Sequence, residues 1–375
     1  MSTATERTSS ERQTARAFTS ARRQSLRRRL LKWYRDHARD LPWRRSRDPY
    51  RVWISEVMLQ QTQVATVREY FERFIAALPD VDHLAAADEQ QVLRLWEGMG
   101  YYRRARQLHA AAKEIVSKNA GDFPSDVCEL IKLPGIGRYT AGAIASIAFG
   151  RRAPILEANT IRLLSRLICF EGDPSTAAGQ RLLWRTAEEI LPHKDVAEFN
   201  QALMELGSLV CTPAEPKCHE CPLSSLCAAR GSGLQREIPQ PKSRKEYTEL
   251  REAAVVIRHR GRVLMRQCGK EERWAGLWDF PRFALEADGP LFAADEIAEK
   301  VLRQSGIRCI PGPLLKRLRH GVTRFRITLD CYEATYAGGR ARSAGGAPVR
   351  WLKCDVLPTL PLSTSGRKLA ELVSR

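Results

Sequence analysis

The chain has 375 residues, of which 43% are hydrophobic, and its 61 Lys and Arg against 43 Asp and Glu give a formal net charge of +18. This composition excludes a disordered or fibrous protein, and because no stretch approaches the ~18 apolar residues of a membrane span, we expect a globular protein of two or three domains that does not cross a membrane. The Arg-rich start has no apolar segment behind it, which argues against a secretory signal, and the positive charge favours a polyanionic partner such as nucleic acid.

Most of the excess charge lies near the two ends of the sequence. Residues 1–30 contain 8 Arg and 2 Glu (+6), residues 31–230 contain 26 basic and 25 acidic residues (+1), and residues 231–375 contain 27 and 16 (+11). Residues 1–25 are rich in Ser, Thr and Arg, which predicts a flexible basic arm. This arm is either a solvated tail or a general contact to nucleic acid, and Glu6 and Glu11 argue against a transit peptide.

From residue 26 to about residue 230, apolar residues recur with the spacing of amphipathic helices. We expect an all-helical domain that is interrupted at Pro and Gly residues. The expected helical segments are 52–78 (one helix or two), 92–96, 103–118, 140–149, 161–168, 179–190 and 198–210.

The sequence changes in character after residue 230. Residues 231–250 predict a linker, because Gly and Pro alternate there with charged residues. Residues 251–375 predict a separate α+β domain, with a hairpin within 253–266, a strand at 324–335 and helices at 293–304 and 366–373.

Four of the ten cysteines lie close together, with the spacing C-x6-C-x2-C-x5-C: Cys211, Cys218, Cys221 and Cys227. A tetrahedral zinc site more often has two closely spaced pairs, whereas this group has one. Four thiolates on a compact loop suit a [4Fe–4S] cluster, which we expect to order the loop and to have no open catalytic position.

The segment Leu133-Pro134-Gly135-Ile136-Gly137 lies between two predicted helices. Gly135 and Gly137 allow a sharp turn with exposed amides at the start of the following helix, which is a suitable site for a DNA phosphate. By itself such a turn is equally compatible with a plain helix–helix connection.

The L-P-G-I-G hairpin followed by the four-Cys loop resembles the helix-hairpin-helix DNA glycosylases of the endonuclease III superfamily. Within it, the segments LPWR (41–44), SEVMLQQTQV (55–64) and GMGYYR (98–103) resemble the MutY-type adenine DNA glycosylases. The resemblance covers about residues 26–230 closely and the C-terminal part more weakly.

This resemblance implies a mainly α fold of two helical subdomains with a [4Fe–4S] loop, plus a C-terminal α+β Nudix-like domain that reads 8-oxoguanine. Pyrophosphate hydrolysis is not expected of that domain. A hydrolytic Nudix helix needs a Glu-rich R-E-x-x-E-E pattern, and the segment 296–304 offers only Glu296, Glu299 and Lys300.

Adenine leaves the sugar poorly unless its ring is protonated, so its release needs an acid at the base. The sugar then passes through an oxocarbenium-like state, which needs an anion under the sugar. Glu56, in an otherwise apolar helix, is the candidate acid, and burial would raise its pKa. The resemblance assigns DNA contacts to Arg44, Gln61 and Tyr101, the last two as residues that wedge into the duplex when adenine is flipped.

Position 139 and the segment Glu157-Ala158-Asn159 decide the reaction type. Lyase members of the superfamily carry a nucleophilic Lys at the position of Tyr139, and because a phenol forms no imine, we predict a monofunctional glycosylase. We expect Tyr139 to hydrogen-bond the second carboxylate. The family pattern there is Asp-Gly-Asn, so Glu157 keeps the charge on a longer side chain, and Asn159 would orient it.

The C-terminal domain also departs from the family. The loop that reads 8-oxoguanine carries a Phe-Ser-His tip in the family, and the best match here is Val322-Thr323-Arg324. Thr323 supplies a hydroxyl and Arg324 a donor to a purine or phosphate, but Val322 has no ring to stack. A basic loop that contacts only backbone phosphate is the alternative.

The function predicted from the sequence is removal of adenine mispaired with 8-oxoguanine or guanine in double-stranded DNA. Two alternatives remain open: a thymine or uracil mismatch glycosylase, and a lesion-binding homologue whose catalysis is weakened by Glu157. We expect a monomer and, if the source is bacterial, a cytoplasmic, nucleoid-associated protein.

Overall fold

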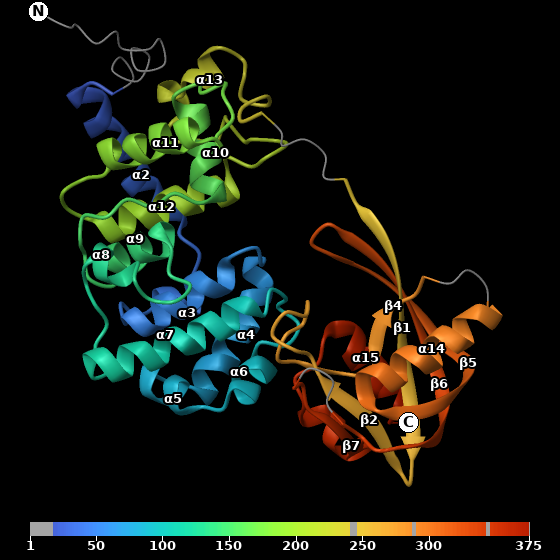
Figure 1. Cartoon of the computed structure of the whole chain (residues 1–375). Coiled ribbons are helices and arrows are strands. Elements are labelled where there is room, and N and C mark those ends of the chain that lie inside the picture. The colour runs from blue at the N-terminus through green and yellow to red at the C-terminus, as the bar shows by residue number, and fades with distance from the viewer. Residues whose placement is uncertain (1–17, 241–245, 287–289, 343–345, 375) are drawn as a thin grey trace, which may run out of the picture. The chain divides into compact units, whose positions relative to one another are not determined.

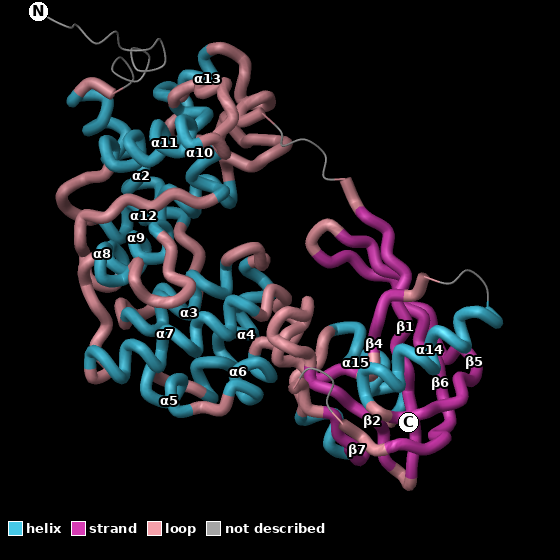
Figure 2. The backbone as a smooth tube through the Cα atoms, viewed as in Figure 1, coloured by secondary structure: helices cyan, strands magenta, loops and turns pink. Residues whose placement is uncertain are grey.

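The computed structural model describes residues 18–240, 246–286, 290–342 and 346–374. These residues divide into two compact units: unit 1 comprises the chain up to Ala85 together with Ala110–Lys242, and unit 2 comprises Ala86–His109 together with Ser243–Arg375. Figure 1 labels the elements of both units, and Figure 2 shows that helices dominate the first part of the chain and strands the last part. Within the described ranges, no helix has both the length and the apolar character needed to cross a membrane.

Helices build the chain as far as residue 231, as the apolar spacing predicted. They are α2 (Ser20–His37), η1 (Pro42–Arg44), α3 (Pro49–Leu59), α4 (Val64–Ala77), α5 (Val81–Ala86), α6 (Glu89–Leu95), α7 (Arg103–Asn119), α8 (Val127–Leu130), α9 (Arg138–Ile147), α10 (Ala158–Leu167), α11 (Ala177–Ile190), α12 (Val196–Leu209), η2 (Ser224–Leu226) and α13 (Ala228–Gly231). The predicted region 52–78 is two helices. The short helices α5, α8 and α13 were missed because so few residues give no clear periodicity. Helix α2 was also not among the expected segments, and charged residues dominate its sequence.

The beginning of α2 corrects the predicted arm. Thr19 caps this helix through its side chain, and Phe18 and Leu26 are buried in the core. Residues 1–17 lie outside the described residues, and they carry three Arg and two Glu, a net charge of only +1. The other five positive charges of residues 1–30 lie on α2, where Arg22 donates to the Leu226 carbonyl and Arg23 pairs with Glu189. Residues 18–25 are therefore folded and not part of an arm.

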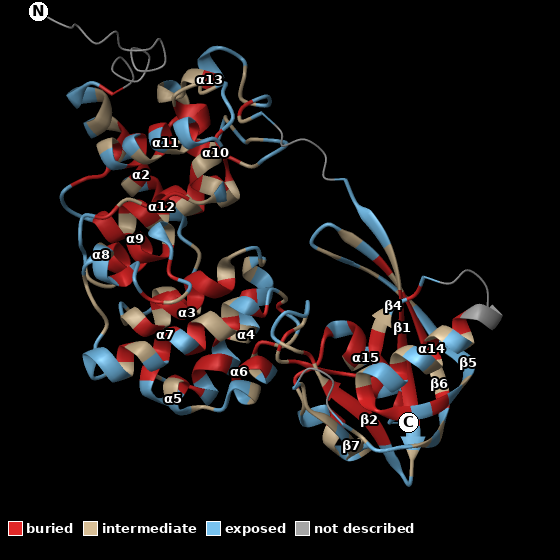
Figure 3. Cartoon of the chain, in the orientation of Figure 1, coloured by how far each residue is buried: buried red, intermediate tan, exposed pale blue. Residues whose placement is uncertain are grey.

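The core of the upper part of unit 1 lies among α2, α10, α11 and α12. Leu30, Leu164, Leu183 and Phe199 are buried there, with relative exposure of 0%. Helix α9 packs on α3 and α12, and its residues Thr140–Ile147 are all buried. Figure 3 shows this burial on the facing sides of the helices. Both faces of α3 and α9 are therefore covered, and any polar side chain that they carry inward lies away from water.

The described strands of unit 2 form one seven-stranded sheet: β1 (Thr248–His259), β2 (Arg262–Gln267), β3 (Trp278–Asp279), β4 (Arg282–Ala284), β5 (Ile307–Val322), β6 (Phe325–Gly339) and β7 (Val349–Lys353). The main path runs β3-β2-β1-β6-β5, with β1 parallel to β6. Helices α14 (Pro290–Ser305) and α15 (Thr364–Val373) and the turn η3 (Cys354–Thr359) complete the unit. The β1–β2 hairpin, the strand at 324–335 and both helices agree with the sequence predictions.

The second unit includes a segment that the sequence assigned to the helical domain. Residues 86–109, which contain α6, the Gly98–Tyr102 turn and the start of α7, group with the C-terminal residues. Trp96 and Leu93 are fully buried there. Sequence periodicity identified these residues as helical but could not show what the helices pack against.

Candidate active site

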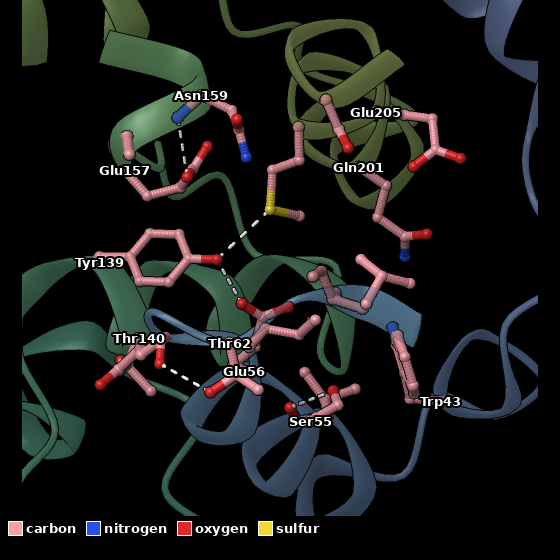
Figure 4. A pocket seen from close by; sticks show the side chains of 18 of the residues that line it. Trp43, Ser55, Glu56, Thr62, Tyr139, Thr140, Glu157, Asn159, Gln201 and Glu205 are labelled. Carbon is pink, nitrogen blue, oxygen red and sulfur yellow. Dashed lines mark hydrogen bonds between the residues drawn. The ribbon is translucent and has the colours of Figure 1, made fainter. Parts of the chain in front are cut away.

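A cavity of about 860 Å³ in unit 1 brings together the predicted catalytic residues. It is lined by the ends of α3, α9, α10 and α12, and Figure 4 shows the side chains that point into it. Glu56 enters from α3, Tyr139 from α9, and Glu157 and Asn159 from the start of α10. Segments separated by about 80 residues therefore meet at one place, as catalysis would require.

Glu56 is a buried acid. Its side chain lies on the inward face of α3 with a relative exposure of 4%. Burial is the largest cause of a rise in the pKa of its carboxyl to about 7; the hydrogen bond from Tyr139 opposes this rise and the nearby charge of Glu157 adds to it. Glu56 can therefore hold a proton near neutral pH, as the sequence predicted.

Tyr139 bonds a different carboxylate from the one predicted. Its hydroxyl donates to Oε2 of Glu56, not to Glu157, and lies 3.3 Å from Sδ of Met204. The reason is that Tyr139 is the second residue of α9, which packs directly on α3. Burial, and then the charges of Glu56 and Glu157, raise the pKa of Tyr139 well above its usual range, so the phenol remains a donor.

Glu157 is the N-cap of α10. Its carboxylate accepts the backbone N–H groups of Asn159 at 2.8 Å and Thr160 at 2.9 Å, and the Thr160 side chain accepts the N–H of Glu157 at 2.7 Å. This capping box fixes the longer side chain at the positive end of a helix. Burial raises the pKa of Glu157, and these two amide hydrogen bonds oppose the rise. Ala158 is the first residue of the helix, and any L-residue can adopt the helical conformation at this position.

Asn159 holds the Glu157 carboxylate through its backbone N–H. The side-chain Oδ1 accepts from Arg162 at 2.8 Å. Helix α12 approaches closely here, since a Cβ on Gly207 would lie 2.8 Å from Cβ of Asn159. Gly207 is a supporting residue that the sequence analysis missed.

Arg44 is held inside unit 1 by a buried carboxylate that the sequence analysis also missed. Glu205 on α12, whose side chain is 1% exposed, accepts from Arg44 at 2.8 Å and from Arg39 at 2.7 Å. These arginines hold the pKa of Glu205 down to about 2, against the effect of burial. The ion pair gives Arg44 a structural role, and because Arg44 also lines the cavity, its contact with DNA stays a prediction. Glu205 could have been found by a signal similar to that of Glu56, an acid within an otherwise uncharged and mostly apolar stretch (202–210), although Glu198 lies on the same helix.

The glycine hairpin has the expected geometry. Gly135 has a φ of +75°, in the left-handed region that favours glycine, and Gly137 is the N-cap of α9. A Cβ on Gly137 would meet nothing within 4 Å, so this helix start is open. Gln61 lines the same cavity from the end of α3 and also has a positive φ, +59°.

Tyr101 belongs to a second cavity, of about 560 Å³, that lies wholly in unit 2. It is 49% exposed, and Val322 and Thr323 of the β5–β6 turn line the same cavity. Thr323 has a φ of +54°, and its hydroxyl donates to the Val322 carbonyl at 2.7 Å. The Arg324 guanidinium lies over the Phe325 ring, 5.1 Å from its centroid.

The four cysteines line one pocket between the end of α12 and α13: Cys211, Cys218, Cys221 and Cys227. Burial raises the pKa of Cys221 to about 12 and also raises that of Cys227, and the neighbouring sulfurs add to both shifts. Arg166, which is buried, donates to Cys211 Sγ at 3.3 Å. Such a donor set suits a cationic group that stabilises thiolates. Among the described residues, no three His, Cys, Asp or Glu are arranged to hold a single metal ion.

The pKa of Glu56 predicts a pH dependence of stability. Because the folded value, about 7, exceeds the ordinary 4.5, the fold binds the proton more tightly than the unfolded chain. The unfolding free energy of the parent should fall relative to that of Glu56→Gln as pH rises from 4.5 to 7, by up to ~3 kcal/mol. Urea denaturation of both proteins at pH 5 and pH 8 measures this difference. A difference that does not change with pH would contradict it.

Comparisons with known proteins agree with this architecture. Residues 54–189 match the model of the HhH-GPD superfamily of base excision DNA repair proteins, and residues 252–372 match that of the NUDIX domain. The adenine DNA glycosylase of Homo sapiens is 33% identical over 91% of this chain and 72% of its own length. That of Buchnera aphidicola subsp. Schizaphis graminum is 38% identical over 68% of this chain and 74% of its own.

Solved structures match the helical part. A thermostable thymine-DNA glycosylase has a TM-score of 0.52 at 27% identity and covers 56% of this chain and 98% of its own. Endonuclease III in a non-covalent complex with DNA has a TM-score of 0.50 at 23% identity, over 58% of this chain and 99% of its own, and shows the fold alone. The predicted fold class is confirmed.

Proposed function

We propose that this chain, which belongs to the adenine DNA glycosylase family, hydrolyses the N-glycosidic bond of adenine mispaired with 8-oxoguanine or guanine in duplex DNA. The observation that carries the proposal is the pairing of a buried, protonatable Glu56 with an anchored Glu157 in one cavity. The cavity is large enough for a flipped base, and its hairpin offers a helix start to a phosphate.

In the proposed mechanism Glu56 transfers its proton to a ring nitrogen of adenine as the bond from the sugar to the base breaks. Tyr139 holds the Glu56 carboxyl in place and stabilises the carboxylate that remains. Glu157, with two amides holding its carboxylate, stabilises the positive charge that develops on the sugar. A water molecule then adds to the sugar and gives its proton to the Glu56 carboxylate, which restores the acid, and free adenine leaves.

The residues around the cavity support hydrolysis without a covalent intermediate. A Schiff base needs a lysine amine, and Tyr139 occupies the hairpin position at which the lyase members of the superfamily carry that lysine. No lysine is among the residues that line the cavity in the part of the chain that the structure describes. We infer a monofunctional glycosylase.

The cavity in unit 2 is the proposed site for the base opposite adenine. Tyr101 presents an exposed ring there, and Thr323 places a hydroxyl at the β5–β6 turn. A base that loses its stacked partner gains ~1–3 kcal/mol from stacking on an aromatic ring. Arg324, which lies over Phe325, is proposed to contact only the backbone.

The four-cysteine pocket is proposed to hold a [4Fe–4S] cluster with Cys211, Cys218, Cys221 and Cys227 as ligands. When bound, the cluster supplies the positive charge that makes the thiolates stable, and it orders the loop after α12. Iron and sulfide content of the purified protein tests this proposal.

A single-turnover assay with three duplexes tests the function. Release of free adenine is expected from the A:8-oxoguanine and A:G duplexes, and no base release from the T:G duplex. Thymine release would instead support the mismatch glycosylase, in keeping with the fold match to a thymine-DNA glycosylase. Tight binding of A:8-oxoguanine without base release would support the lesion-binding alternative.

Removal of residues 1–17 should hardly change non-specific DNA binding. Their net charge is +1, so the slope of log K against log salt should fall by no more than about one. Binding to an undamaged duplex at several salt concentrations measures the slope. A decrease of about three would mean that all three arginines of the segment contact phosphate.

A further inference from the structure

Two segments on either side of the unit 2 cavity are joined to each other by hydrogen bonds. The Gly98–Tyr102 turn lines one side, and Ser363–Ser365 with Lys368 line another. The Tyr102 hydroxyl donates to the Leu362 carbonyl at 3.3 Å. Because the two segments are some 260 residues apart in sequence, the width of the cavity depends on how they are held together.

Glu97, which directly precedes the turn, is the centre of this connection. Its side chain is only 9% exposed. Oε1 accepts from Arg367 Nε at 2.7 Å, and Oε2 accepts from Arg367 Nη2 at 3.0 Å, a bidentate pair. The backbone N–H of Leu362 donates to Oε2 at 3.2 Å. One carboxylate thus binds both the side chain and the backbone of the opposite segment.

Arg367 also donates hydrogen bonds to two backbone carbonyls, in addition to its pair with Glu97. Its Nη1 donates to the Leu357 carbonyl at 2.8 Å, and its Nη2 donates to the Leu360 carbonyl at 2.6 Å. The guanidinium therefore ties η3 to the start of α15 and both to Glu97. A planar fork with charge-assisted bonds of this kind fixes geometry, which a lysine ammonium would not do.

The turn that Glu97 precedes has hydrogen bonds of its own, since Trp96 Nε1 donates to the Gly100 carbonyl at 3.1 Å and Arg104 donates to the Met99 carbonyl at 3.3 Å. Glu97 and Arg367 therefore affect where the turn lies relative to the opposite segment. Gly98 has a φ of +95° and Gly100 a φ of +69°, conformations that glycine adopts without strain and leaves with equal ease. Tyr101, also at positive φ, follows directly. Neither Glu97 nor Arg367 lines the cavity, so any effect of the pair on a bound base acts through the turn.

We propose that the Glu97–Arg367 pair is a positioning clamp that sets the separation between the Tyr101 turn and the Ser363–Lys368 segment, and thereby the discrimination between 8-oxoguanine and guanine opposite adenine. This inference rests on the proposed function of the cavity. Glu97 and Arg367 touch no reacting group, so the chemistry at Glu56 should continue without the clamp.

The test compares full-length Glu97→Gln and Arg367→Lys with the parent and with Glu296→Gln as a matched control. Glu296 is a half-buried carboxylate of the same unit that pairs with Lys300 on α14 and does not line the cavity. Affinities are measured for duplexes with a non-cleavable adenosine analogue opposite 8-oxoguanine or guanine. Single-turnover adenine release from A:G is measured in parallel.

The clamp predicts that the affinity ratio for 8-oxoguanine over guanine falls ~10-fold in both variants, as expected for the loss of charge-assisted hydrogen bonds, and stays at the parent value in Glu296→Gln. Release from A:G should remain close to the parent rate. An unchanged ratio in the variants, an equal fall in Glu296→Gln, or a parent with no preference for 8-oxoguanine would each overturn the clamp. Failure of the proposed function would appear separately, as absence of adenine release from the parent.

Discussion

Glu56→Gln is expected to lower the single-turnover rate of adenine release by ~10²–10⁴-fold, the usual contribution of a positioned general acid. Glutamine keeps the size of the side chain and can still accept the Tyr139 hydroxyl, but it has no proton to give to the base. Because burial opposes the charged carboxylate, the variant should be as stable as the parent or more stable above pH 7. The measurement is adenine release from an A:8-oxoguanine duplex with enzyme in excess.

A matched control for this substitution is Glu129→Gln. Glu129 lies on α8 in the same unit, where its side chain is 55% exposed and pairs with Lys132. This variant should retain the parent rate. If Glu56→Gln stays within tenfold of the parent while the control also does, Glu56 is not the proton donor.

Glu157→Gln is expected to lower the same rate by ~10²–10³-fold, since it removes a fixed negative charge from the developing positive sugar. Glu157→Asp keeps that charge, and because a displacement of about 1 Å can cost ~10²-fold, its rate should lie between those of the parent and Glu157→Gln. The same A:8-oxoguanine assay ranks the three proteins. An inactive parent together with an active Glu157→Asp would favour the lesion-binding alternative.

The stability effect of losing the helix cap at Glu157 needs its own control. Thr176 caps α11 by accepting the N–H of Gly179 at 3.1 Å, and it does not line the cavity. Thr176→Ala should cost ~1 kcal/mol of stability, as N-cap substitutions do, without loss of rate. A comparable loss of rate in Thr176→Ala would mean that weakened folding, not charge, explains the Glu157 variants.

The sequence by itself determined most of the elements and the candidate residues of the site. Amphipathic spacing located most of the longer helices but not α2. The strands alternate or run apolar over short distances. Both signals depend on residues that are near in sequence. Glu56 was identified by its place in an apolar helix, and the four cysteines by their spacing. The net charge of +18 pointed to nucleic acid, although some of the positive side chains form ion pairs within the fold, such as Arg23 of α2 with Glu189 and Arg39 with Glu205.

Only the tertiary structure decided which partner each side chain has. In the structure the Tyr139 hydroxyl donates a hydrogen bond to Glu56, and Arg44 forms an ion pair with Glu205. Residues 86–109 group with the C-terminal domain. Glu97 and Arg367 carry no motif, and their pairing follows from how α6 and α15 pack. The physical reason is that local periodicity states which face of an element is buried. The contacts on that face depend on the packing of segments that lie more than 80 residues apart in the chain.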